Sequence, residues 1–240
     1  MKILALDSTA TSASVALCNG NTPIAVYTQK TGLTHSETLL PMVEAVLKNA
    51  KCTVDDVDML AVSDGPGSFT GVRIGVSAIK GLAFGKNKIC VGTSTLDSLA
   101  RNAKGLEGDF LAVPVMDARR NQLYNAVFEY KDGAMTRLCE DRLLSANDLA
   151  AELIAYDKPV YFFGDGYAIA SKLDIPGKRS TPELLILQNA ASVAASALEK
   201  YESSEDKSSF TDLALSPKYL RASQAEREEE RKRKENQNET

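Results

Sequence analysis

The sequence predicts an α/β protein made of two similar halves. Short apolar segments of strand length alternate with longer segments in which apolar residues recur at helical spacing. In the first half, three strand-like segments are separated by turn-forming residues and precede a helical segment. The second half starts in the same way, and the first strand of each half ends in an aspartate, Asp7 or Asp117. These observations predict a repeated unit of three strands followed by helices.

The expected elements alternate along the chain. In the first half we expect strands at 3–6, 13–17, 24–27, 59–63 and 88–91 and helices at 36–50, 71–85 and 96–103. In the second half we expect strands at 110–116, 122–130, 136–143 and 160–163 and a helix at 146–156. Two copies of three antiparallel strands followed by helices are what actin-like and sugar-kinase-like folds contain. The spacing between the copies is not constant, so the sequence indicates a duplication without fixing its register.

Length and composition fit two lobes that share a cleft. The chain has 240 residues, of which 44% are hydrophobic and 25% charged, as in ordinary globular proteins. We expect an N-terminal lobe at 1–105, a C-terminal lobe at 106–222 and a charged, disordered tail at 223–240. The net charge of −4 argues against a non-specific polyanion binder. The basic run 231–234 has acidic neighbours, so contact with RNA would need a local basic patch or a partner.

Cysteine usage and the N-terminus indicate a cytoplasmic protein. The four cysteines form no Cys-x-x-Cys pair, which favours reduced thiols over a zinc site or a disulfide framework. They are Cys18, Cys52, Cys90 and Cys139. The apolar run at the N-terminus is interrupted by a charged residue too early for a signal peptide. No apolar run approaches the roughly 20 residues that span a bilayer. We therefore expect neither a membrane segment nor a bound metal.

The most informative segment is 64–75, with the sequence Asp-Gly-Pro-Gly-Ser-Phe-Thr-Gly-Val-Arg-Ile-Gly. It follows an apolar strand and opens a helix, and such a turn leaves backbone N–H groups free for an anion. It is not a P-loop, because no Gly-Lys-Ser/Thr ends it, and its glycine spacing differs from the dinucleotide fingerprint. Together with the first turn it forms a candidate vestigial nucleotide or anion loop. The residues of this candidate loop are Asp7, Ser8, Thr9, Gly65, Gly67, Ser68, Thr70 and Arg73.

Further motifs occur in a fixed order between residues 1 and 222. They are Leu-Ala-Leu-Asp-Ser-Thr at 4–9, Thr-His-Ser-Glu at 34–37 with Leu-Pro at 40–41, the loop at 65–75, Asp-Ala-Arg at 117–119 with Tyr124, and Pro-Lys-Tyr-Leu-Arg at 217–221. With this set the chain resembles the TsaB (YeaZ) family of bacterial tRNA threonylcarbamoyladenosine biosynthesis proteins. The resemblance implies an actin-like, duplicated ribonuclease H-like fold of the ASKHA type, with two lobes around a cleft.

The resemblance also implies a function. Such a chain is the scaffold and activating subunit of the complex that forms N6-threonylcarbamoyladenosine at position 37 of ANN-decoding tRNAs. Its partner TsaD transfers the threonylcarbamoyl group, and the ATPase TsaE docks on the pair. Contact with tRNA is then indirect, ATP and Mg²⁺ enter only at the level of the complex, and the chain alone forms a homodimer. The alternative is an ATP-dependent small-molecule kinase of the same fold.

The single histidine, His35, argues against catalysis by this chain. By resemblance, TsaD carries a metal-binding His-x-x-x-His, whereas here Leu39 stands four residues after His35. Two imidazoles one helical turn apart can grip a metal together, but an imidazole and a leucine cannot. A hydrolase is disfavoured because no Gly-x-Ser-x-Gly elbow is present. Thr34 and Glu37 have capping-box spacing, which favours a helix-entry role for His35.

Two helical segments, 36–50 and 71–85, are candidates for the partner interface. The first carries an apolar stripe wider than one core contact requires, and the second is rich in glycine. A glycine-rich helix needs a close neighbour, which is either a partner helix, as the resemblance implies, or this chain's own sheet. The interface candidates are Leu39, Leu40, Val43, Val46, Leu47, Gly71, Ile74, Gly75, Ala78 and Leu82. The sequence assigns no binding or catalytic role to the motif residues His35, Asp117, Arg119, Tyr219 and Arg221.

Overall fold

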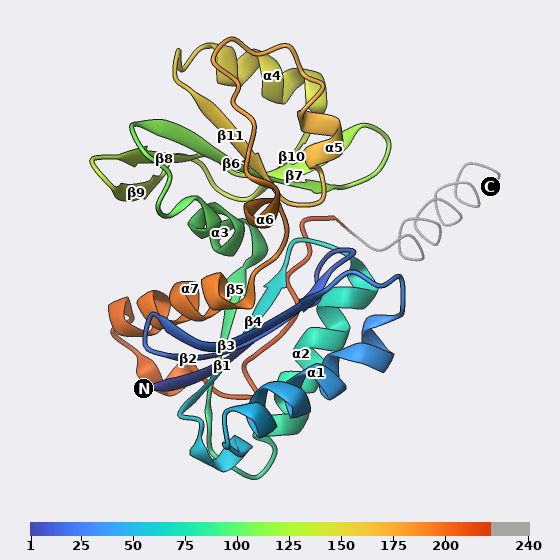
Figure 1. The fold of residues 1–240 in the computed structure, drawn as a ribbon, viewed down its shortest axis with the longest axis vertical. Helices are drawn as coiled ribbons and strands as arrows, with labels where there is room; N and C mark the ends of the chain where they lie inside the picture. Colours follow the sequence, from blue (N-terminus) through green and yellow to red (C-terminus); the bar gives the residue numbers. More distant parts are fainter. Residues whose placement is uncertain (222–240) are drawn as a thin grey trace, which may run out of the picture.

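The structure, a computed structural model, describes residues 1–221 and consists of two α/β lobes (Figure 1). The predicted tail at 223–240 lies outside the described residues. The strands of the first lobe are β1 (Lys2–Asp7), β2 (Ala13–Asn19), β3 (Thr22–Gln29), β4 (Met59–Gly65) and β5 (Ile89–Ser94). Its helices are α1 (His35–Asn49), α2 (Phe69–Ala83) and α7 (Ala190–Ser203). Within residues 1–221, no helix combines the length and the apolar character needed to cross a bilayer.

The first lobe is a three-layer sandwich around a five-stranded sheet of order β3-β2-β1-β4-β5. β1 pairs antiparallel with β2 and parallel with β4, and β4 pairs parallel with β5. Helices α1 and α2 cover one face of the sheet, and α7 covers the other (Figure 1). Because β1 and β4 are buried on both faces, they read as continuous apolar runs instead of alternating ones.

The second lobe repeats the plan around β6 (Phe110–Asp117). β7 and β8 pair antiparallel with successive halves of β6 in one continuous register, since Asp117 lies opposite Leu123 and Phe110 lies opposite Tyr130. β10 continues outward from β7, β9 continues outward from β8, and β11 pairs with β6 in parallel. These strands are β7 (Gln122–Asn125), β8 (Phe128–Lys131), β9 (Ala134–Arg137), β10 (Arg142–Ser145) and β11 (Val160–Phe163). The strand order thus matches the β3-β2-β1-β4 part of the first sheet.

The predicted strands and helices are present, with two interruptions. The expected strands at 122–130 and 136–143 are each broken into two, and at the break the Val127 N–H donates to Cys139 Sγ at 3.2 Å. The expected helix at 96–103 is α3 (Thr95–Ala100) followed by a single 3-10 turn, η2 (Arg101–Ala103). The other short helices are α4 (Ala146–Ile154), α5 (Tyr167–Ala170) and α6 (Glu183–Ile186), with 3-10 turns η1 (Val54–Asp56) and η3 (Lys207–Ser209).

The division of the chain at residue 105 needs a correction. Helix α7 lies in the second half of the sequence, yet its apolar face packs on β1, β2 and β4 of the first lobe. Helix α3 lies in the first half, yet Leu96 and Leu99 pack with Phe110 and Phe128 of the second lobe. The chain therefore passes between the lobes more than once, and these crossings hold the two lobes on either side of one cleft.

Candidate functional site

The first turn, between β1 and β2, is closed by its own hydrogen bonds. Asp7 is 1% exposed, and its Oδ1 accepts bonds from the Thr9 N–H at 2.9 Å and the Thr9 hydroxyl at 2.7 Å. Its Oδ2 accepts from the Ser63 hydroxyl on β4 at 2.6 Å. Burial raises the pKa of Asp7 above its usual value, because the ionised form is desolvated. Asp7 thus braces the turn, and it does not line the cleft between the lobes.

The glycines of the 64–75 segment let α2 approach this turn. The Ser8 hydroxyl donates to the Gly71 carbonyl at 2.8 Å, and a Cβ at Gly71 would collide with the Ser8 carbonyl oxygen. A Cβ at Gly75 would lie 2.7 Å from Ser8 Oγ. Both glycines therefore face this chain's own turn, so their placement at a partner interface is wrong. Gly81 is exposed, and a Cβ there would meet nothing within 4 Å.

The apolar stripe of α1 also divides into two faces. Leu39, which is 1% exposed, and the other inward-facing candidates form the core under the first sheet and are covered by it. This corrects the interface expectation for Val43, Val46 and Leu47, whereas Leu39 also lines the groove between α1 and α2. Leu40 points away from the core and is 52% exposed. Ile74, Ala78 and Leu82 on α2 are partly buried at the edge of the same core.

A groove of about 620 Å³ runs between α1 and α2. Leu40, Ile74 and Ala78 contribute apolar surface to it, and Phe69 and Arg73 line it at the start of α2. His35 also lines it, with Nε2 lying 2.6 Å from the Ala10 carbonyl oxygen, so the imidazole holds the start of α1 against the first turn. The capping box is confirmed, because the Thr34 N–H donates to Glu37 Oε2 at 3.1 Å.

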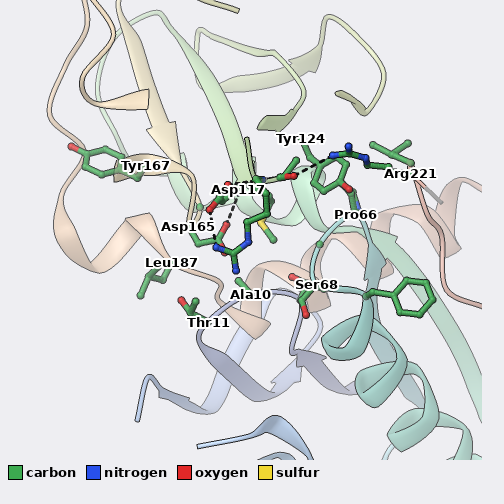
Figure 2. A pocket seen from close by; sticks show the side chains of 18 of the residues that line it. Ala10, Thr11, Pro66, Ser68, Asp117, Tyr124, Asp165, Tyr167, Leu187 and Arg221 are labelled. Carbon is green, nitrogen blue, oxygen red and sulfur yellow. Dashed lines mark hydrogen bonds and ion pairs between the residues drawn. The ribbon is translucent and has the colours of Figure 1, made fainter. Parts of the chain in front are cut away.

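A larger cavity of about 680 Å³ fills the cleft between the lobes (Figure 2). The second lobe supplies two neighbouring carboxylates, and Asp165 Oδ1 accepts a bond from the Asp117 N–H at 3.1 Å. Burial, with a smaller contribution from the Asp117 charge, raises the pKa of Asp165 to about 6. Asp117 in turn accepts from the Arg119 N–H at 2.7 Å. Basic side chains also line the cavity, namely Lys30, Arg119, Lys218 and Arg221.

The single histidine and the two carboxylates of the cleft do not come together. His35 lies in the α1–α2 groove, whereas Asp117 and Asp165 lie in the cleft. Among residues 1–221 no three histidine, cysteine or acidic side chains are placed to hold one metal ion. Of the predicted loop residues, Thr9, Gly67 and Ser68 line the cleft, and Thr70 and Arg73 line the groove.

The closing motif, 217–221, contacts both lobes, and two of the residues that make these contacts were not singled out from the sequence. The Tyr219 ring stacks on Phe69, with ring centroids 4.5 Å apart, and its hydroxyl accepts a bond from Arg73 Nε at 2.8 Å. Lys218 Nζ pairs with Asp64 Oδ2 at 3.2 Å. Phe69 and Lys218 each lie inside a recognised motif, which was the available signal, but only the folded chain shows what they touch.

Two lobes of this strand order around one cleft define a protein of the actin-like class. A family model described as "TsaD: tRNA N6-adenosine threonylcarbamoyltransferase" matches residues 25–233. TsaB of Bacillus subtilis is 31% identical over 228 residues, which cover 94% of this chain and 96% of that protein. TsaB of Escherichia coli is 36% identical over 129 residues, about half of each chain at 54% and 55%. The solved YeaZ from Pseudomonas aeruginosa superposes with a TM-score of 0.76 at 26% identity, covering 91% of this chain and 99% of that one. The chain belongs to the TsaB (YeaZ) family.

Proposed function

We propose that this chain is a non-catalytic subunit in the formation of N6-threonylcarbamoyladenosine at position 37 of ANN-decoding tRNAs. It holds and activates a TsaD partner through the groove between α1 and α2, and the same face pairs two copies when the partner is absent. TsaE docks on the pair, and tRNA is contacted through the partner. The observation that carries this proposal is an outward helix face on α2 that the described part of the chain, residues 1–221, leaves uncovered.

The outward face of α2 has the residue pattern of a close helix crossing. Residues at helical spacing along it are Arg73, Ile74, Ser77, Ala78 and Gly81, of which the last three are small. Small side chains let a second helix approach, so that its ridges fit the groove of the first. Leu40 on α1 stands across the groove and supplies an exposed apolar anchor. A partner helix pair would bury this surface.

The polar groups of the chain support a role without bond-making. The carboxylate of Asp7 is engaged by Thr9 and Ser63, and the imidazole of His35 lies against the Ala10 carbonyl. A phosphotransferase would need such polar side chains to be free to bind a metal ion and the phosphate groups. Under the kinase alternative, the isolated chain would bind Mg-ATP in a calorimetric titration, whereas we expect no saturable heat.

Reconstituted tRNA modification tests the proposal. Leu40→Glu places a charge in the apolar groove without touching the core, so it should abolish threonylcarbamoyladenosine formation with TsaD, while the variant melts like the wild type. Leu184→Glu, at a residue 95% exposed on α6, is the matched control and should leave modification intact. Full modification by a folded Leu40→Glu variant would overturn the assignment of the groove.

A further inference from the structure

The closing motif spans from the first lobe to the second, and we call Pro217–Arg221 the strap. Its backbone is fixed to the first lobe, because the Lys218 N–H donates to the Asp64 carbonyl at 2.7 Å. The Lys218 side chain pairs with the buried carboxylate of the same residue at 3.2 Å. The other oxygen of that carboxylate, Oδ1, has no hydrogen-bond partner within the described chain. The strap is thus held where β4 turns into α2.

Tyr219, the next residue of the strap, is one layer of a three-part stack. The Tyr219 ring lies on Phe69 at an interplanar angle of 24°, and the Arg73 guanidinium lies 3.9 Å from the centre of the Phe69 ring. The Tyr219 hydroxyl accepts the Arg73 Nε bond, which fixes the direction of the guanidinium. Phe69 and Arg73 both line the α1–α2 groove, and Phe69 also lines the cleft.

The last residue of the strap reaches the second lobe. The Arg221 guanidinium donates to the Ala118 carbonyl at 3.4 Å and to Gln122 Oε1 at 3.3 Å. Both acceptors belong to the β6–β7 hairpin that carries Asp117 and Arg119 over the cleft. The two bonds are long and their acceptors are neutral, so this end is the weaker of the two attachments.

We propose that the strap couples the interlobe cleft to the docking groove, with Tyr219 as a positioning residue for the partner-facing Phe69 and Arg73. This inference rests on the proposed function of the groove. One residue separates Tyr219 from Arg221, so their Cα atoms are at most about 7 Å apart. If the β6–β7 hairpin moves further than this short link can follow, either the Arg221 bonds break or Tyr219 is drawn off Phe69. Closure of the cleft and docking of the partner therefore favour each other, and the coupling acts equally in both directions.

The stack lies at the surface, which separates its role from a role in folding. Tyr219 is 40% exposed and Arg73 is exposed, so neither belongs to a core cluster. Loss of the stack changes the orientation of groove residues more than it changes the buried area of the lobe. Tyr219→Phe keeps the ring on Phe69 and loses the Arg73 bond, which makes it a graded variant between the wild type and Tyr219→Ala.

Hydrogen exchange on the full chain tests the coupling directly. Within residues 1–221 the hydrogen bonds that Arg221 donates go to the second lobe, yet Arg221→Ala should speed exchange at amides 71–74 of α2 at least about five-fold, the lower end of typical couplings. Faster exchange confined to residues 117–122 would overturn the proposal. Leu213→Ala, at an exposed residue before the strap, is the matched control and should leave both regions unchanged.

Affinity for TsaD provides the second readout. Tyr219→Ala should weaken binding at least about five-fold, Tyr219→Phe less, and both should melt close to the wild type. Wild-type affinity in Tyr219→Ala would show that Tyr219 does not position the groove. If the wild type itself fails to bind TsaD while amides 71–74 still respond to Arg221→Ala, the proposed function fails and the link between hairpin and helix stands.

Discussion

The two lobes place an aspartate at the same topological corner, and they use it differently. In the first lobe, Asp7 ends β1, is buried, and is bonded to Thr9 and Ser63, while α2 packs directly on the turn that follows. In the second lobe, Asp117 ends β6, and its side chain is 29% exposed beside the cleft. The three residues Arg119, Arg120 and Asn121 that follow all have positive φ, between 55° and 69°.

The helices that follow the two corners differ in the same way. The first lobe continues from β4 into α2, a helix of 15 residues, and the second continues from β11 into α5, a helix of four. The long helix closes the first corner and leaves its outer face, with Arg73 and Ser77, exposed. The short one leaves Asp117 and Asp165 facing the cavity. A duplicated topology has thus produced one sealed corner and one open corner.

Glycine substitutions should give the largest difference within the sealed corner. Gly71→Ala places a methyl group against the Ser8 carbonyl, which cannot move without shifting β1, so we expect a loss of about 3 kcal/mol in the free energy of unfolding. Gly81→Ala, in the same helix but in open space, should instead gain about 0.5–1 kcal/mol through helix propensity. Chemical denaturation measures both, and equal effects at the two positions would contradict the sealed-corner description.

Removing each corner aspartate compares the lobes directly. Asp7→Ala leaves the Thr9 and Ser63 donors buried without an acceptor, so we expect a cost of about 2 kcal/mol. Asp117→Ala removes a partner of the exposed Arg119, whose groups return to water, so we expect less than about 1 kcal/mol. Urea denaturation of the two variants decides the point, and a larger cost at Asp117 would reverse the comparison.

The pH dependence of the open corner gives a smaller effect. The pKa of Asp165 in the folded chain is about 6, raised from 3.8, so the folded state favours the protonated carboxyl. Its contribution to stability is present below about pH 4 and is lost as the pH rises through 6. Relative to Asp165→Asn, the wild type should therefore lose about 1 kcal/mol between pH 4 and 7, after allowance for partial exposure. Parallel stability curves for the two proteins over this range would show that Asp165 is not perturbed.

Much of the fold follows from patterns that the sequence carries locally. The strands around both corners and the helices α1 and α2 were predicted, because apolar periodicity and turn residues mark them. Helix α7 was missed because its buried face includes Ser192 and Ser196, which bond to Asn102 and Asp97, so its apolar period is interrupted. Only the tertiary structure shows that α7 returns to the first sheet.

The candidate site was predicted in outline and misassigned in detail. The sequence marked α1 and α2 as unusual, but it could not show on which side of each helix the chain's own sheet lies. Gly71, Gly75 and Val43 face inward, whereas Leu40 and Ala78 line the groove. Glycine lets a backbone approach another, and the sequence does not say whose backbone that is. The joining of both lobes by the strap was likewise invisible, because Arg73, Ala118 and the strap are far apart in sequence.

The most direct test of the account is the affinity of Ala78→Leu for TsaD, measured by calorimetry beside its melting temperature. Ala78 is partly exposed on the outer face of α2, so a leucine there should hold a partner helix away, at a cost of about 1–3 kcal/mol, which is a loss of roughly five-fold or more in affinity. The melting temperature should stay within about 3 °C of the wild type. Wild-type affinity in the folded variant would contradict the claim that this face is where the partner binds.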